Sequence, residues 1–290
     1  MPSRAASVRA RNREDLILEI VREGRRQLAV EGAAGLSLRA VARELGMVSS
    51  AVYRYVASRD ELLTLLIVDA YDDAADAAER AERAVDRDDL PGRWRAFCHA
   101  TRDWALAHPH EYALVYGSPV PGYRGNEETT RAAVRITTVL GGILRDASAG
   151  AAAPASAAAP AAAAAPASAA APASAGAPAK ASSSVPATSS VPATSRRADA
   201  PGARGRSADP PPPDRLRADM LALLPTPVFA HPDGMPGEID PVVLMRGLMA
   251  WVEVFGLISF ELFGQFANAI HELDAMFAHA VDLLAADMLT

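Results

Sequence analysis

Hydroxyl, arginine and tyrosine side chains gather in one stretch, residues 37–56, SLRAVARELGMVSSAVYRYV. Apolar residues recur at helical spacing through its first half, which predicts a helix with Arg39 on the opposite face. Gly46 ends that helix, and Ser49 or Ser50 is predicted to cap a second short one. Its outward residues are Ser50, Ala51, Tyr53 and Arg54. Two short helices joined by a glycine-containing turn describe a helix-turn-helix, the motif that places its second helix in the DNA major groove.

These residue types suit both parts of a DNA contact. Arginine binds guanine through two hydrogen bonds and alanine meets a thymine methyl group, so the base-reading candidates are Ser49, Ser50, Ala51 and Arg54. Hydroxyl groups hold phosphates without reading sequence, which indicates Tyr53, Tyr55 and Ser37 for that role, and Arg39 fits either role. The alternatives are an ordinary helical hairpin within an all-α core and, for Arg54, a solvated surface position.

The sequence contains no residue pattern typical of an enzyme active site. Cys98 and His99 are neighbours, which point about 100° apart on a helix and cannot form a nucleophile–base pair directly. His108 and His110 flank a proline beside Glu111, but no further spaced ligand cluster follows to complete a metal site. Gly-rich phosphate loops and serine elbows are missing from the sequence. We therefore expect neither an enzyme nor a bound metal or cofactor.

Helices are predicted on both sides of the helix-turn-helix, where they can support it. A helix predicted at about 13–32 precedes it, and a capping box at residues 58–61 opens a long helix after it. The run LSLRAVARELGMVSSAVYRYVASRDELL closely resembles the DNA-binding domain of TetR-family transcriptional regulators, over about residues 13–75. The resemblance implies a three-helix head followed by a fourth helix. It also implies that Arg59, where family members commonly carry lysine, contacts phosphate, and it places Tyr55 near a position usually held by histidine.

The charge distribution agrees with a chain of which one end meets DNA. The whole chain has a net charge of −6, but residues 1–60 contain eleven arginines against seven acidic residues. A basic end on an acidic remainder orients an approaching nucleic acid. Cys98 is the single cysteine, which excludes an intrachain disulfide and favours a reducing compartment. The N-terminus has no apolar stretch typical of a signal peptide, so we expect a cytoplasmic protein.

The rest of the chain is predicted to be helical, apart from one segment. Residues 148–213 are dominated by Ala, Pro and Ser, and frequent prolines without large apolar residues favour a disordered, low-complexity insertion. The apolar segment Val242–Phe266 contains Arg246, Glu253 and Glu261, which argues for a buried helix rather than a membrane span. Further helices are predicted at about 58–89, 92–108, 111–116, 127–147, 216–224, 241–266 and 269–288.

The predicted fold class is all-α: a three-helix helix-turn-helix head plus an α-helical ligand-binding and dimerisation body, interrupted by the insertion. The expected domains are a flexible basic arm at 1–12, a TetR-type DNA-binding domain at 13–75, a regulatory and dimerisation domain at 76–147 and 214–290, and the insertion at 148–213.

The body also resembles part of the TetR family, a subgroup named for a Trp-His-Gly motif. Trp251 and Gly256 match that motif, whereas Phe255 stands where the histidine would be. In the family the two terminal helices of each subunit form a four-helix bundle, which implies a homodimer. Aromatic and methionine side chains of the body are the candidates to line an inducer pocket, although each can equally belong to the core: Trp94, Trp104, Tyr112, Tyr116, Met245, Met249, Trp251 and Phe255.

These observations together predict a sequence-specific transcriptional regulator and repressor. It is expected to bind a palindromic operator in double-stranded DNA as a homodimer, without a membrane partner, and to leave it when a small-molecule inducer binds. The alternative from another class is a helical protein-interaction module without DNA binding.

Overall fold

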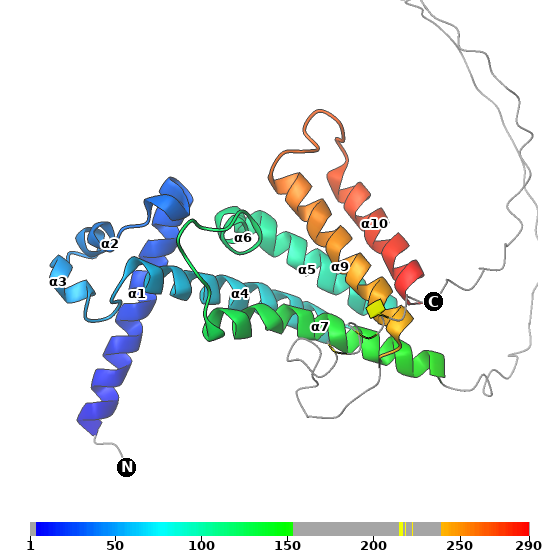
Figure 1. The fold of residues 1–290 in the computed structure, drawn as a ribbon, viewed down its shortest axis with the longest axis horizontal. Helices are drawn as coiled ribbons and strands as arrows, with labels where there is room; N and C mark the ends of the chain where they lie inside the picture. The colour runs from blue at the N-terminus through cyan, green and yellow to red at the C-terminus, as the bar shows by residue number, and fades with distance from the viewer. Residues whose placement is uncertain (1–3, 153–214, 217, 219–221, 223–238, 290) are drawn as a thin grey trace, which may run out of the picture. The chain divides into compact units, whose positions relative to one another are not determined.

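A computed structural model describes residues 4–152, four residues between 215 and 222, and residues 239–289. Every element within these ranges is an α-helix, in agreement with the predicted fold class. The greater part of the predicted insertion and most of the helix expected at 216–224 lie outside the described residues. The helices are labelled as in Figure 1.

The head comprises α1 (Arg4–Gly35), α2 (Leu38–Glu44), α3 (Ser49–Val52) and the first half of α4 (Arg59–Arg83). α1 begins at Arg4, so the segment expected to be an arm before residue 13 continues the helix; its alanines are strong helix formers. Fully buried side chains from all four helices, and Val56 from the segment between α3 and α4, form one core: Ile20, Val41, Val52, Val56, Leu62 and Leu63. This core fixes the two short helices on α1 and α4.

Local capping explains where the helices of the head begin. The Ser37 hydroxyl accepts a hydrogen bond from the Ala40 N–H at the start of α2, and Ser58 does the same for Glu61 at the start of α4. The Glu61 carboxylate accepts in return from the Ala57 N–H at 2.5 Å. Caps of this kind stabilise a helix by about 1 kcal/mol each. The sequence predicted both.

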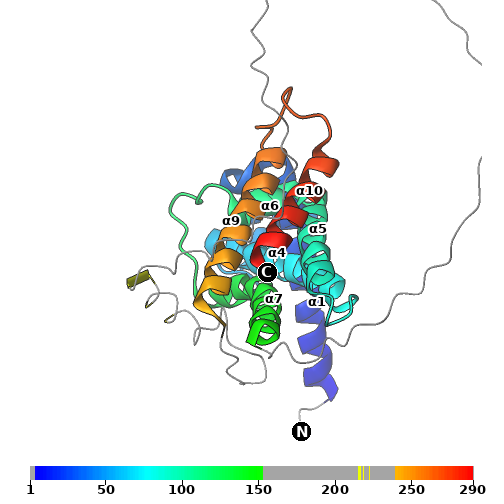
Figure 2. The same ribbon diagram turned by 90° about the vertical axis from the view of Figure 1, so that its right-hand side faces the viewer.

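α4 runs from the head into the body, whose other helices are α5 (Leu90–Ala107), α6 (Pro109–Tyr116), α7 (Glu127–Ala152), α9 (Pro241–Leu262) and α10 (Leu273–Met288). α4 lies along α5 and α7, and α9 and α10 pack side by side on α5 (Figures 1 and 2). The second half of α4 presents Ala74, Ala75 and Ala78 inward, which lets the neighbouring helices approach closely.

α7 extends beyond the predicted boundary at 147. Ser148 is buried, its hydroxyl donates to the Leu144 carbonyl, and it accepts from the Asp240 N–H at 3.1 Å. Asp240 in turn caps α9 through the N–H groups of Val242 and Val243. Ser148 therefore belongs to the packed body and joins the end of α7 to the start of α9.

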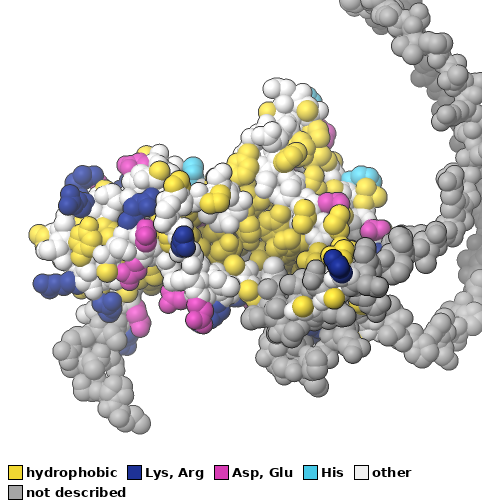
Figure 3. All heavy atoms as spheres, viewed as in Figure 1, with side chains coloured by type: hydrophobic (Ala, Val, Ile, Leu, Met, Phe, Trp, Pro, Cys, Tyr) yellow, Lys and Arg dark blue, Asp and Glu magenta, His cyan; other side chains and the backbone are white. Residues whose placement is uncertain are grey.

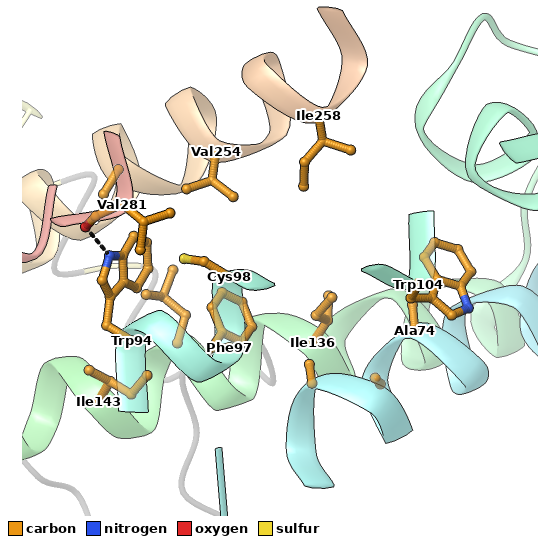
Figure 4. Packing of buried hydrophobic residues seen from close by; sticks show 14 of the residues in the cluster. Ala74, Trp94, Phe97, Cys98, Trp104, Ile136, Ile143, Val254, Ile258 and Val281 are labelled. Atoms are coloured by element: carbon orange, nitrogen blue, oxygen red, sulfur yellow. Dashed lines mark hydrogen bonds between the residues drawn. The ribbon is translucent and has the colours of Figure 1, made fainter. Parts of the chain in front are cut away.

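The body core is built around aromatic side chains of α5. In Figure 4, Val254 and Ile258 of α9 point into the core, and Val254 lies near Cys98 of α5. The Trp94 indole N–H donates to the Val281 carbonyl of α10 at 3.0 Å, which satisfies its single buried donor. These contacts hold α9 and α10 on α5 and leave the outer faces of the two helices uncovered.

Candidate nucleic-acid interface

The turn between α2 and α3 orients the proposed recognition helix. Gly46 adopts φ +66°, the left-handed conformation that glycine enters without strain, and the Met47 N–H then bonds to the Ala42 carbonyl at 2.8 Å. Val52 and Val56 are fully buried behind α3. The opposite side of α3 must therefore face outward.

The cap of α3 differs from the prediction. Val48 occupies the N-cap position in an extended conformation and makes no side-chain cap hydrogen bond, whereas the sequence pointed to Ser49 or Ser50. The chain leaves the Gly46 turn already extended, so the helix starts one residue sooner than a serine cap would allow. Ser49 and Ser50 are exposed in the first turn of α3, where their hydroxyls are open to a partner.

The predicted DNA-contacting residues lie in or beside α2, α3 and the start of α4, and none of them is fully buried. Arg39, Ser49, Ser50, Tyr53 and Arg54 are exposed. Ser37, Ala51, Tyr55 and Arg59 are partly buried. In Figure 3 the dark blue Lys and Arg side chains stand out over the end of the molecule formed by the head. This arrangement places the serines of α3, and Arg54 in the turn after it, over the apolar core of the head.

Arg13, the first residue of the predicted DNA-binding domain, contacts this group, although the sequence did not predict it as a contact residue. Its guanidinium lies over the Tyr55 ring, 5.4 Å from the centroid, and donates to the Arg54 carbonyl at 3.1 Å. Arg13 therefore ties the N-terminal half of α1 to the end of the recognition helix. The excess of arginine near the N-terminus was the available signal, but only the fold brings residues 13 and 55 together.

Arg59 has a second partner that the sequence did not predict. One of its guanidinium nitrogens donates to the Ala33 carbonyl near the end of α1 at 2.6 Å. An arginine has five N–H donors, so this bond leaves donors for a phosphate. Arg59 thus fixes the start of α4 against α1, independently of any contact to DNA.

Ion pairs connect the head to the acidic face of α4. Arg25 of α1 binds Asp69 and Asp73 at 2.6 and 2.5 Å. Burial raises the pKa of Asp69, against the lowering effect of Arg25. Farther along the same helix, Arg135 of α7 binds Asp72 and Asp76, and Arg93 of α5 binds Glu82. Ion pairs therefore join α4 to α1 of the head and to α5 and α7 of the body.

The candidate inducer residues are mostly packed against one another. Trp94, Trp104 and Tyr112 are buried, and the Tyr112 hydroxyl pairs with Ser259 at 2.8 Å. The rings of Tyr116, Phe255 and Trp251 form a continuous cluster with centroid separations of 4.6 and 4.4 Å. Met245 is partly buried, and Met249 is exposed on the outer face of α9. Of the eight candidate inducer residues, only Trp104 lines a cleft among the described helices, one between α4 and α5.

Two other clefts differ sharply in chemistry. One, of about 230 Å³, lies among α4, α5 and α7 and is lined mainly by charged side chains, including Arg93, Arg135 and Asp146. The other, of about 410 Å³, lies among α4, α6, α7 and the loop before α7, and its lining carries no charge. Neither cleft could be predicted from the sequence, because both form between helices distant along the chain.

The residues weighed for catalysis are engaged in packing. Cys98 is fully buried, and burial raises the pKa of its thiol well above the usual value. The neighbouring His99 ring lies edge-on to Phe277, at 5.5 Å between centroids. His108 stacks on Trp104 at 5.7 Å. Among the described residues, no group of three or more His, Cys, Asp or Glu side chains is placed to hold a metal ion.

Sequence comparisons identify relatives with a regulatory role. Residues 20–66 match the model for bacterial regulatory proteins of the tetR family, and residues 94–284 match the model for the tetracyclin repressor-like C-terminal domain. The HTH-type transcriptional regulators Mb1846 of Mycobacterium bovis and Rv1816 of Mycobacterium tuberculosis are each 51% identical over 147 residues. Those matches cover 48% of this chain and 59% of each relative's length.

Structural comparison agrees with the sequence match. The crystal structure of a protein described as a regulatory protein, SCO4313, has a TM-score of 0.62 and 25% identity and covers 98% of both chains. A protein of unknown function from Rhodococcus sp. RHA1 shares the fold, with a TM-score of 0.55, 18% identity and coverage of 93% of this chain and 94% of that one. Because one family model spans more than half of the chain and another matches the head, the chain belongs to the TetR family of helix-turn-helix transcriptional regulators and is not an enzyme.

Proposed function

We propose that this regulator is a cytoplasmic, homodimeric repressor that binds a palindromic operator and leaves it when a small molecule binds the body. The observation that carries the DNA-binding part is the outward side of α3 and of the turn that follows it, where Ser49, Ser50, Tyr53 and Arg54 are exposed while Val52 and Val56 are fully buried. A surface helix with this composition, held by its apolar side, matches the geometry of major-groove readers.

Each predicted contact residue has a proposed role. Arg54 reads guanine, Ala51 contacts a thymine methyl, and Ser49 and Ser50 bond to base edges. Ser37, Tyr53, Tyr55 and Arg59 contact phosphates and fix the register, and Arg39 serves either purpose. Arg13 supports this set by covering the Tyr55 ring.

The outer face of α9 supports the dimer. Met249, Val252, Phe260 and Phe263 are all about half exposed or more, and with Gly256 they follow the three- and four-residue spacing of one helix face. A Cβ built on Gly256 would meet nothing within 4 Å, so another helix can approach closely there. Leu283 of α10 is exposed as well. A continuous apolar stripe on adjacent helices is typical of an interface between subunits.

α9 also satisfies the length and composition of a membrane span, and 28% of its most apolar window is buried. Its charged residues favour a protein interface instead. Glu261 of α9 pairs with Arg102 of α5, whose side chain is only 6% exposed, so one end of α9 is fixed to the body by an ion pair. A second copy of the same stripe covers the remaining face through a two-fold axis.

Arg54 provides the test of base reading. Arg54→Ala is expected to lower operator affinity by about 1–3 kcal/mol and to relax the preference at one base position in each half-site, since a bidentate guanine contact is lost. Fluorescence anisotropy against operators substituted at each position measures both effects.

Arg43→Ala is the matched control, because Arg43 is also an exposed arginine of the head, on the far end of α2. It should reduce affinity uniformly and weakly across the substituted operators. An Arg54→Ala variant with an unchanged base preference would remove Arg54 from the readers of sequence.

A further inference from the structure

The uncharged cleft lies at the joint between body and head. Its walls come from α4, α6, α7 and residues 117–126, the loop between α6 and α7. Ile67, Leu114, Val115 and Val120 supply apolar surface. Its volume of about 410 Å³ falls within the range of small-molecule sites.

The polar groups of this cleft are few and already paired. The Tyr71 hydroxyl donates to the Val115 carbonyl at 3.2 Å, the Tyr123 hydroxyl pairs with Thr64 at 2.9 Å, and the Thr129 hydroxyl donates to the Asn126 carbonyl at 2.9 Å. No charged residue lines the cleft, so an ionic ligand would lose its hydration without gaining a counter-charge. The chemistry therefore favours a neutral, mainly apolar occupant.

Tyr116 does not line the cleft, but it contacts Tyr71, which does. The Tyr116 ring lies edge-on to Tyr71, with 5.8 Å between centroids. Its hydroxyl is buried and has no hydrogen-bond partner in the described part of the chain. Buried polar groups are normally bonded, and a ligand with one acceptor or donor would satisfy this one after a small movement of Tyr71. The occupant is thus expected to carry a single hydrogen-bonding group.

The same walls touch the core that holds the recognition helix. Leu114, Val120 and Tyr123 pack against the apolar core of the head. Tyr123 is bonded to Thr64, whose hydroxyl is in turn within 3.0 Å of the Asp60 carbonyl in the first turn of α4. A molecule that pushes these three side chains apart moves contacts that position α4 and the head.

We propose that a neutral, apolar small molecule with one hydrogen-bonding group binds this cleft and, by displacing Val120 and Tyr123, lowers the affinity of the head for DNA. This inference rests on the ligand-responsive function proposed above and assigns its site and ligand class. The proposed effector site is thus the cleft among α4, α6 and α7, and not the aromatic side chains of the body that the sequence indicated.

Two fluorescent probes with one skeleton separate neutral from charged ligands. N-phenyl-1-naphthylamine is neutral, with a single N–H, and 8-anilinonaphthalene-1-sulfonate adds a sulfonate. Titrated into the full-length protein, the neutral probe is expected to bind with one site per protomer and at least about tenfold more tightly than the sulfonate, because the sulfonate finds no counter-charge in the cleft.

Variants that fill the cleft with a large side chain test whether the probe binds there. Ala133→Trp and Thr130→Trp, on α7, each place an indole in the cleft and should weaken binding of the neutral probe at least about tenfold. Gly142→Leu is the control on the same helix, because it points into the charged cleft, where a Cβ meets nothing within 4 Å. It should leave the affinity of the neutral probe unchanged. Thr130 is exposed, so its variant remains informative if Ala133→Trp does not fold.

Operator binding in the presence of the neutral probe tests the coupling. At saturation, the probe is expected to weaken operator binding at least about fivefold in the wild type and in Gly142→Leu, and to have no effect in the two tryptophan variants. Tight binding of the sulfonate, unchanged probe affinity in both tryptophan variants, or operator binding that ignores the probe would each overturn the inference. A protein that binds no duplex contradicts the proposed function instead, while the probe affinities still decide the site.

Discussion

Replacing Val252 with glutamate is expected to convert the protein to a monomer and to lower its affinity for operator DNA at least about hundredfold. Val252 is 65% exposed in the apolar stripe of α9, so the change costs the isolated subunit little. A two-fold interface would bury the new carboxylate from both subunits without a partner, which opposes association strongly. A single head then loses the advantage of binding two linked half-sites.

Sedimentation velocity measures the subunit state, and fluorescence anisotropy measures operator affinity. Val30→Glu is the control, because Val30 is also an exposed helical valine, on α1 away from the stripe. It should remain dimeric. A Val252→Glu variant that is still dimeric would place the interface elsewhere.

Replacing Arg102 with methionine is expected to lower the free energy of unfolding by about 3–5 kcal/mol. Its guanidinium binds Glu261 of α9 and Asp274 of α10 at 2.7 and 2.6 Å and lies over the Phe277 ring. Glu261 is only 11% exposed, so the substitution leaves a nearly buried carboxylate without its cation. Chemical denaturation at neutral pH measures the loss.

Arg95→Met is the matched control for that experiment. Arg95 also joins α5 to α10, through Asp282, but both side chains are about half exposed. Solvent screens such a pair, so the loss of stability should be much smaller than for Arg102→Met. Adding Glu261→Leu to Arg102→Met should recover much of the stability, because the only carboxylate then left without Arg102 is Asp274, which is 93% exposed to water. Equal effects of the two arginine variants would contradict the role assigned to Arg102.

The features that the sequence predicted well depend on neighbouring residues. Ser37 and Ser58 cap helices through N–H groups three residues away, and Gly46 ends α2 through its own backbone conformation. The apolar period then separates Val52 and Val56 from the exposed residues of α3. Because all of this is local, the helices of the head and the outward side of the recognition helix could be predicted without tertiary information.

The features that were missed depend on contacts across the fold. Arg59 donates to Ala33, and Tyr123 bonds to Thr64 59 residues away, pairings that no local spacing encodes. Aromatic side chains look alike in sequence whether they fill a core or line a cleft. Trp94 and Tyr112 are buried in packing, whereas Tyr123 borders a cleft. Whether Arg54 and Tyr53 contact DNA as proposed stays a prediction.

Selection of bound sites from a random pool of duplex DNA tests the central claim most directly, when combined with an affinity measurement across salt concentrations. Two identical heads held by α9 and α10 should select a palindrome whose half-site centres lie about 34–36 Å, or one helical turn, apart. Affinity should fall steeply as salt rises, since several phosphate contacts release counterions. A monomeric protein that enriches no sequence and binds no duplex at low ionic strength would contradict this account.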